Sequence, residues 1–171
     1  MTADLEAWEA EVAALWDRVD SLTRSAVIAA MSELALSCPA RDGRAEFELA
    51  GAYDSMGFEA EAATHYERAL ALGLDEARHA QLAVQYGSTL RNLGQLDEAI
   101  DMLRSAPAHE STGAAPRIML ALALHSAGRA NEALRVAIEA QLDSLPRYER
   151  SLRAYAEALT EPEAFDGEPA D

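Results

Sequence analysis

The chain has 171 residues, of which 50% are hydrophobic and only 6% aromatic, and this composition favours closely packed helices over a β-sheet. The formal net charge of -16 would repel the phosphates of nucleic acids and of anionic lipids, so we expect neither as a partner. No run of 18 or more apolar residues is present and the first residues are acidic, so we expect no membrane span or signal peptide and predict a cytoplasmic protein.

The first segment predicts two helices. Apolar residues recur at helical spacing on both sides of Asp20 and Ser21, either of which could cap the second helix. Pro39 then ends the pattern, because proline cannot continue a helix. We therefore predict an N-terminal helical pair, or a degenerate repeat, over residues 1–38.

Three segments that follow share one pattern, in which a glycine breaks an apolar helix and a second helix resumes. The breaking residues are Gly57, Gly94 and Gly128, which are 37 and 34 positions apart. The second spacing equals the period of a 34-residue helical repeat, and the first needs three extra residues, which we place in the loop at residues 73–75. The repeats are expected at residues 43–76, 80–113 and 114–145.

Small residues recur in register with these glycines. Seven positions before each glycine stand Ala50, Gly87 and Ala121, and five positions after it stand Ala62, Ala99 and Ala133. Antiparallel helices approach closely only where the facing side chains are small, and a glycine inside a helix costs about 1 kcal/mol relative to alanine. Gly87 is therefore predicted to lie at a close helix–helix contact.

This register of small residues around a glycine turn is similar to the consensus of the tetratricopeptide repeat family, although the early tryptophan of that consensus is absent. The strings FELAGAYDSMGFEAEAATHYERALALGL, QLAVQYGSTLRNLGQLDEA and LPRYERSLRAYAEAL also resemble a little-characterised group of bacterial tetratricopeptide proteins. The resemblance implies an all-α fold, namely a right-handed α-solenoid of antiparallel helix pairs. It also implies a scaffold that binds other proteins and is not an enzyme.

The C-terminal segment is expected to cap the solenoid. A helix over residues 146–160, capped by Ser144, would bury a stripe that consists of Tyr148, Leu152, Tyr155 and Leu159. Residues 161–171 are acidic and contain two prolines, and they are expected to be disordered. We assign residues 1–160 to a single domain.

By the same resemblance, the first helix of each pair lines a concave groove that would bind a protein or peptide. The candidate groove residues are Arg44, Phe47, Asp54, Gln81, Val84, Ser88, Arg91, Asn92, Ile118, Leu122 and His125. Arg91 is the best single candidate, because a guanidinium can donate two parallel hydrogen bonds to a carboxylate. Alternatively, Arg91 pairs with Asp54 or Asp97 and only orders the scaffold.

Two further alternatives concern the N-terminal helices. They could bury Phe47, Val84 and Ile118 and so close the groove. The protein could also be a self-assembling homodimer with Trp8 or Trp16 as the anchor, because large aromatic residues are enriched at interface centres.

Catalysis, a metal and a cofactor are not expected. The four histidines lack ligand spacing such as H-E-x-x-H, and the chain contains no glycine-rich phosphate loop. The single cysteine, Cys38, cannot form an internal disulfide. Asp54 and His125 could face each other across the groove as an acid–base pair, but no other element of an active site accompanies them.

Overall fold

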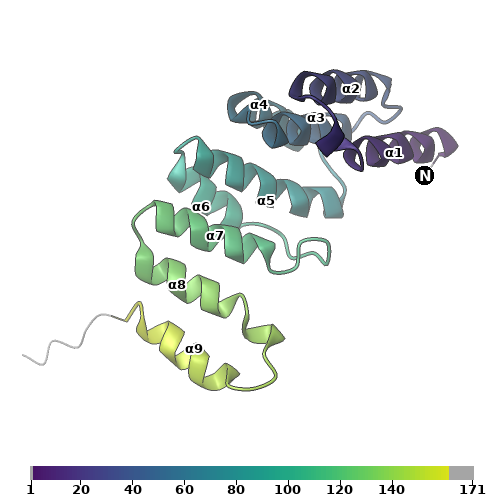
Figure 1. Cartoon of the computed structure of the whole chain (residues 1–171). Helices are drawn as coiled ribbons and strands as arrows, with labels where there is room; N and C mark the ends of the chain where they lie inside the picture. Colours follow the sequence, from purple (N-terminus) through teal and green to yellow (C-terminus); the bar gives the residue numbers. More distant parts are fainter. Residues whose placement is uncertain (1, 162–171) are drawn as a thin grey trace, which may run out of the picture.

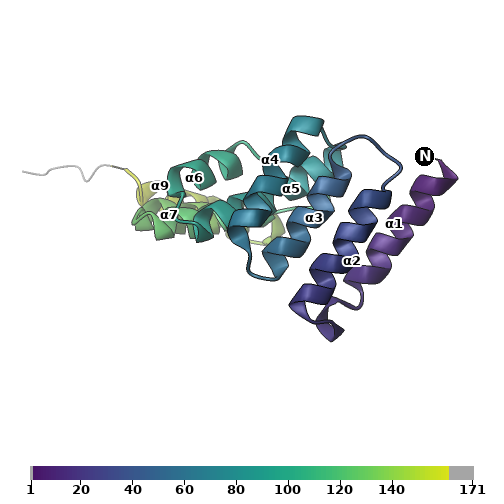
Figure 2. The same ribbon diagram turned by 90° about the horizontal axis from the view of Figure 1, so that it is seen from above.

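The computed structural model describes residues 2–161, which form antiparallel helix pairs stacked in chain order (Figure 1; Figure 2). The helices are α1 (Ala3–Trp16), α2 (Arg24–Ser37), α3 (Arg44–Ser55), α4 (Glu59–Leu72), α5 (Glu76–Asn92), α6 (Leu96–Arg104), α7 (Ala115–Ser126), α8 (Ala130–Glu139) and α9 (Glu149–Ala158), with short 3-10 helices η1 (Val19–Ser21) and η2 (Leu142–Ser144). No strand occurs within this described part of the chain. The predicted all-α solenoid is therefore confirmed, whereas the predicted acidic tail lies, beyond Glu161, outside the described residues.

The three predicted turn glycines end the first helix of three consecutive pairs. Gly57, Gly94 and Gly128 have φ values of 78°, 79° and 75°, in the left-handed region where a side chain would be strained. After each glycine, the next backbone N–H donates to the carbonyl five residues earlier, as Phe58 does to Tyr53 at 3.0 Å. This is the Schellman arrangement, which satisfies carbonyls at the helix end, and its repetition sets the sharp reversal between paired helices.

The three extra residues between Gly57 and Gly94 were predicted to lie in the loop at residues 73–75, but the structure places them elsewhere. The loop at residues 73–75 contains only three residues, while α4 and α5 have 14 and 17 residues against 9 in α6 and 12 in α7. The additional length therefore extends the two helices rather than the loop. Asp75 caps the longer α5 by accepting a hydrogen bond from the backbone N–H of Arg78 at 2.9 Å.

Small residues set the closest approaches between helices, as predicted. Ala50, Ala62 and Ala99 are fully buried in the core of the repeats. A β-carbon added to Gly87 would lie only 2.6 Å from Cγ of Leu103, which is too short for a non-bonded contact between two carbon atoms. Contact between α5 and α6 thus requires glycine at this position.

The N-terminal pair has a core of its own, which α3 completes through Ala52. Trp8 is buried there and donates its indole N–H to the carbonyl of Leu34 at 2.8 Å. Thr23 caps α2, while the predicted caps Asp20 and Ser21 belong to η1. The physical reason is that the chain makes an additional 3-10 turn before α2 begins. Because Trp8 is buried, it is excluded as an exposed dimer anchor.

The C-terminal helix α9 packs on α8 through part of the predicted stripe, because Leu152 and Leu159 are half-buried while its two tyrosines are not. Ala156 is buried and Leu152 is half-buried, whereas Tyr148 and Tyr155 are 75% and 70% exposed. The helix starts at Glu149, after Tyr148, and Ser144 belongs to η2 rather than capping α9. Leu152, Ala156 and Leu159 are spaced at i, i+4 and i+7 and share the face turned to α8, whereas Tyr155 lies outside this face and Tyr148 precedes the helix.

No helix between residues 2 and 161 is long and apolar enough to cross a lipid bilayer.

Candidate partner-binding groove

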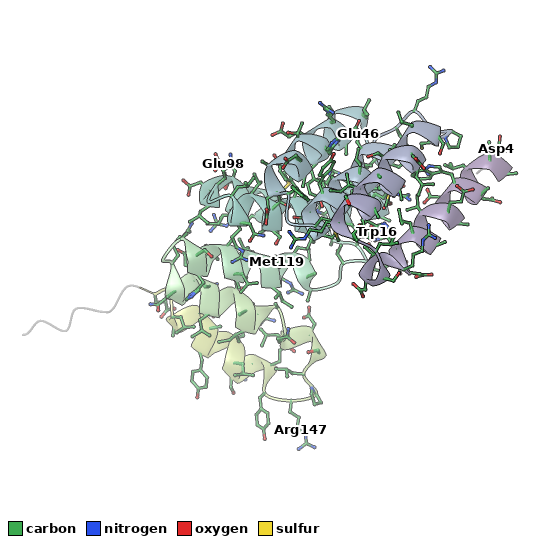
Figure 3. All side chains as sticks on the ribbon, turned by 45° about the horizontal axis from the view of Figure 1, so that its top comes forward. Asp4, Trp16, Glu46, Glu98, Met119 and Arg147 are labelled. Atoms are coloured by element: carbon green, nitrogen blue, oxygen red, sulfur yellow. The ribbon has the colours of Figure 1, made fainter. Side chains whose placement is uncertain are left out.

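The first helices of successive pairs form a continuous wall, because α3 contacts α5 and α5 contacts α7. A cavity of about 690 Å³ opens on this wall where the end of α1 meets α3 and α5. Its lining consists of Trp16, Phe47, Glu48, Gly51, Asp54, Ser55, Tyr66, Gln81, Gln85, Ser88 and Asn92. Figure 3 shows Trp16 at this junction. We call this space the central cavity.

Polar side chains of α5 form one side of the central cavity. Gln81, Gln85, Ser88 and Asn92 are spaced at i, i+4, i+7 and i+11, so they follow one face of the helix. Gln81, Ser88 and Asn92 were predicted as groove residues, whereas Gln85 was not. A polar stripe on a helix with an apolar opposite face was the signal that could have identified it.

Trp16 was suggested as a dimer anchor, but it packs on the N-terminal core and forms a wall of the central cavity. A β-carbon at Gly51 would lie 3.4 Å from Cζ2 of Trp16, so the indole ring lies close against α3. The indole N–H donates to Oε2 of Glu48 at 2.9 Å. No sequence pattern links residues 32 positions apart, so this contact could only be found in the structure.

Two carboxylates face the central cavity. Burial raises the pKa of Glu48, although the hydrogen bond from Trp16 and the charge of Arg78 oppose this rise. Burial likewise raises the pKa of Asp54. The hydroxyl of Tyr66 lies 3.1 Å from Oε1 of Gln85 and 3.4 Å from Oδ2 of Asp54. A phenol carries one proton, so it can donate to only one of these oxygens at a time.

An ion-pair network closes the end of the wall next to α1. Arg44 was predicted to be exposed in the groove, but it is 9% exposed and its Nη atoms lie 2.7 Å from Glu9 and 2.7 Å from Asp42. These carboxylates raise the pKa of the guanidinium, because they stabilise its charged form. The prediction for Arg44 was wrong because Glu9, on α1, reaches it from 35 positions earlier in the chain.

Arg78 belongs to the same network and was not identified from the sequence. It contacts Glu9, Glu48 and Asp75, with a distance of 3.6 Å from its Nε to Oε1 of Glu48. Arg78 lies in the additional N-terminal turn of α5, so the longer helix is what brings it to α1. The network thus joins α1, α3 and α5 at one end of the cavity.

Phe47 is 5% exposed and packs on Tyr66, with ring centroids 6.4 Å apart. It therefore belongs to the core of the repeats and contributes only a part of the cavity floor, instead of the exposed position predicted. The N-terminal helices do not close the groove as the alternative required, because Ile118 is 40% exposed and Val84 is half-buried.

Arg91 lies beyond the central cavity, between α5 and α7. Its Nη1 donates to Oγ of Ser126 at 3.3 Å and its Nη2 to Oδ1 of Asn92 at 3.2 Å. It forms no ion pair with Asp54 or Asp97, both of which the structure describes. The alternative that Arg91 is engaged by either carboxylate is therefore wrong.

The α7 candidates extend the wall. Ile118 and Leu122 are one helical turn apart and are 40% and 44% exposed, so they offer apolar surface to solvent. His125 is exposed as well and makes no hydrogen bond or ion pair with Asp54, so the suggested acid–base pair is not formed. No group of three or more metal-ligating side chains occurs among the described residues.

A stack of antiparallel helix pairs with glycine turns, small-residue contacts and a continuous wall of first helices defines an α-solenoid repeat protein. The family described as "Tetratrico peptide repeat" matches residues 43–159, and the chain belongs to this family. Its members are typically protein–protein interaction scaffolds and not enzymes. No curated protein and no solved structure matches the chain, so the resemblance to a bacterial group stays a prediction.

Proposed function

We propose that this protein is an adaptor that binds a segment of another protein along the wall of α3, α5 and α7. The observation that carries the proposal is the combination of the polar central cavity with the exposed apolar pair Ile118 and Leu122 on the same wall. Apolar contacts supply affinity to a bound segment, while adjacent amides and hydroxyls fix its position through hydrogen bonds. We further propose that residues 1–160 act as one domain, with the repeats divided as the sequence indicates.

A matched pair of leucines tests this proposal. Leu122 on α7 is 44% exposed and Leu134 on α8, the second helix of the same pair, is 51% exposed. Leu122→Glu is expected to abolish retention of the partner, because it puts a charge into the proposed interface, whereas Leu134→Glu is expected to leave retention unchanged. The measurement is affinity capture from an extract of the cells that make the protein, followed by mass spectrometry.

Equal retention by the wild type and by both variants would place the interface elsewhere and would remove the groove proposal. Thermal unfolding of both variants is the control for folding. Both leucines are exposed, so each replacement should change the melting temperature by only a few degrees.

Self-assembly is a second candidate, which the surface of α9 favours. Tyr148 and Tyr155 are exposed there beside Arg147, which lies at the end of the molecule far from Asp4 (Figure 3). A cavity of about 710 Å³ between α1 and α2, at the opposite end, is lined by two carboxylates, those of Glu11 and Glu33, and by one cation, Arg18. Aromatic and basic groups on one end and a cavity with an excess of one negative charge on the other would suit a head-to-tail contact between copies.

Light scattering over a concentration series tests this second candidate. The mass of the wild type is expected to rise with concentration, and the double replacement Tyr148→Ser and Tyr155→Ser should remain a monomer. A wild type that stays a monomer throughout the series would exclude self-assembly through α9.

A further inference from the structure

We propose that the central cavity receives a lysine or arginine side chain of the bound protein segment, with Asp54 as its counter-ion. The inference rests on the proposed adaptor function and specifies the chemistry of the partner. It reverses the expectation that the groove recognises a carboxylate through Arg91, because the cavity itself is acidic.

The lining of the central cavity is unbalanced in charge. It contains the carboxylates of Glu48 and Asp54, and none of its described lining residues is a lysine, arginine or histidine. Glu48 already has two partners, the indole of Trp16 at 2.9 Å and Arg78 at 3.6 Å. Asp54 forms no ion pair with any described residue, so only the hydroxyls of Thr89 and Tyr66 offset its charge.

The charged form of Asp54 is expected to destabilise the protein when the cavity is empty. Its side chain is half-buried, and its hydrogen bond from Tyr66 is long at 3.4 Å. Burial of a carboxylate without a cation disfavours its charged form, which agrees with the raised pKa of Asp54. A cation that enters the cavity would remove this cost, so the site gains more from an ammonium or guanidinium than from a neutral group.

The other walls suit the rest of a basic side chain. Trp16 supplies aromatic surface to the cavity, and Phe47, which is 5% exposed, adds a small part of the floor. Lysine and arginine pack their methylene stems on such surface and place the charged group at the polar end, and a cation is also attracted to aromatic rings. The amides of Gln81 and Gln85 lie opposite and can bind the backbone of an extended segment.

The net charge of the whole chain also favours a basic partner segment. A net charge of -16 attracts a basic segment over a distance and repels an acidic one. A second cavity of about 700 Å³ next to α8 provides an internal comparison. Two of its three acids are paired, Glu132 with Arg129 at 2.6 Å and Glu139 with Arg135 at 2.8 Å, and its lining also includes the cations of Arg104 and Arg135, so that cavity has less demand for a further cation.

The test uses the full chain and a phage-displayed library of random linear peptides as the probe. Peptides selected on the wild type are expected to share one position enriched in lysine or arginine. The best peptide is then synthesised with that residue and with norleucine, which keeps the apolar stem and removes the charge. Both peptides are titrated against the wild type, Asp54→Asn and Asp101→Asn.

Asp54→Asn should weaken binding of the basic peptide about 5- to 30-fold, because the variant removes the counter-ion but keeps the shape of the side chain. The norleucine peptide should bind the wild type and Asp54→Asn equally. Asp101, exposed on α6, is the matched control, since Asp101→Asn removes the same charge outside the cavity and should change affinity less than twofold. These differences should shrink as salt is added.

The outcomes separate this inference from the adaptor function. The inference is overturned if the selected peptides lack a basic residue, or if a basic peptide binds the wild type and Asp54→Asn equally. In either case the adaptor function still stands, provided that Leu122→Glu abolishes peptide binding. Failure to select any peptide, or binding unaffected by Leu122→Glu, would overturn the adaptor function itself.

The melting temperature of Asp54→Asn distinguishes a binding role of Asp54 from a purely structural role, because the two roles predict changes of opposite sign. Asp54→Asn should raise the melting temperature at pH 7 by about 1 to 3 °C, because the uncompensated charge is gone. A lower melting temperature together with equal loss of basic and norleucine peptides would mean that Asp54 only supports the fold.

Discussion

Gly87→Leu is expected to lower the free energy of unfolding by about 3 kcal/mol, at the upper end of the usual cost of overpacking a core. The replacement puts a side chain where even a β-carbon would lie 2.6 Å from Cγ and 2.8 Å from Cδ2 of Leu103. Leu103 is 3% exposed and packed in the core, so a shift of its side chain would disturb the neighbouring core residues. For a chain of this length, the loss corresponds to a fall of roughly 6 to 12 °C in the melting temperature, measured by circular dichroism.

Alanine replacements show whether crowding is the cause. Gly87→Ala should also be destabilising, although alanine favours helix by about 1 kcal/mol over glycine. Gly51→Ala is the matched control inside α3, where a β-carbon would meet Trp16 at 3.4 Å, an ordinary contact, so this variant should be neutral or more stable. If Gly87→Leu unfolds at the same temperature as the wild type, α5 and α6 do not pack as described.

The repeats could be predicted from the sequence because the features that define them depend on residues close together in the chain. A turn glycine such as Gly94 needs a positive φ whatever surrounds it, and its spacing from Gly128 repeats the period of the family. Burial of Ala62 and Ala99 likewise follows from their fixed distance to these turns. Each of these inferences depends on one or two adjacent helices only.

The central cavity could be predicted only in part, because its properties depend on contacts between distant segments. Asp54 was recognised as a groove residue from its register, but its lack of a counter-ion is visible only in three dimensions. Arg44 has the register of a groove residue as well, yet Glu9 and Asp42 bind it and bury it. Tyr155 has the spacing of a buried residue, but α9 buries its neighbour Ala156 and leaves Tyr155 exposed.

Replacement of Arg78 is the second change with a large expected effect. Arg78→Met is expected to lower the free energy of unfolding at pH 7 by about 2 to 3 kcal/mol, because it leaves buried carboxylates without a cation. The side chains of Arg78 and Glu48 are only 17% and 11% exposed, so water cannot replace the lost partner. Glu9 keeps its ion pair with Arg44 at 2.7 Å, so most of the expected loss of stability comes from Glu48.

The pH dependence of this loss identifies its cause. Burial raises the pKa of Glu48, so the folded protein takes up a proton at a higher pH than the unfolded chain. Removal of Arg78 raises that pKa further, and the folded state of the variant therefore gains stability as the pH falls from 7 towards the ordinary carboxyl value. Hydrogen bonds from Arg78 also lower the pKa of Asp75 against the effect of burial, and the wild type loses that stabilisation only in stronger acid, near and below the ordinary carboxyl value.

The difference in unfolding free energy between the wild type and Arg78→Met should thus be largest at pH 7 and smaller at pH 5. Urea denaturation at the two values measures it, and Arg41→Met is the control because Arg41 is exposed. Addition of Glu48→Gln to Arg78→Met should recover part of the loss at pH 7, since the glutamine removes the orphaned charge and still accepts the hydrogen bond from Trp16. A loss that is constant with pH and unaffected by Glu48→Gln would mean that Arg78 stabilises the junction of α1, α3 and α5 through packing alone.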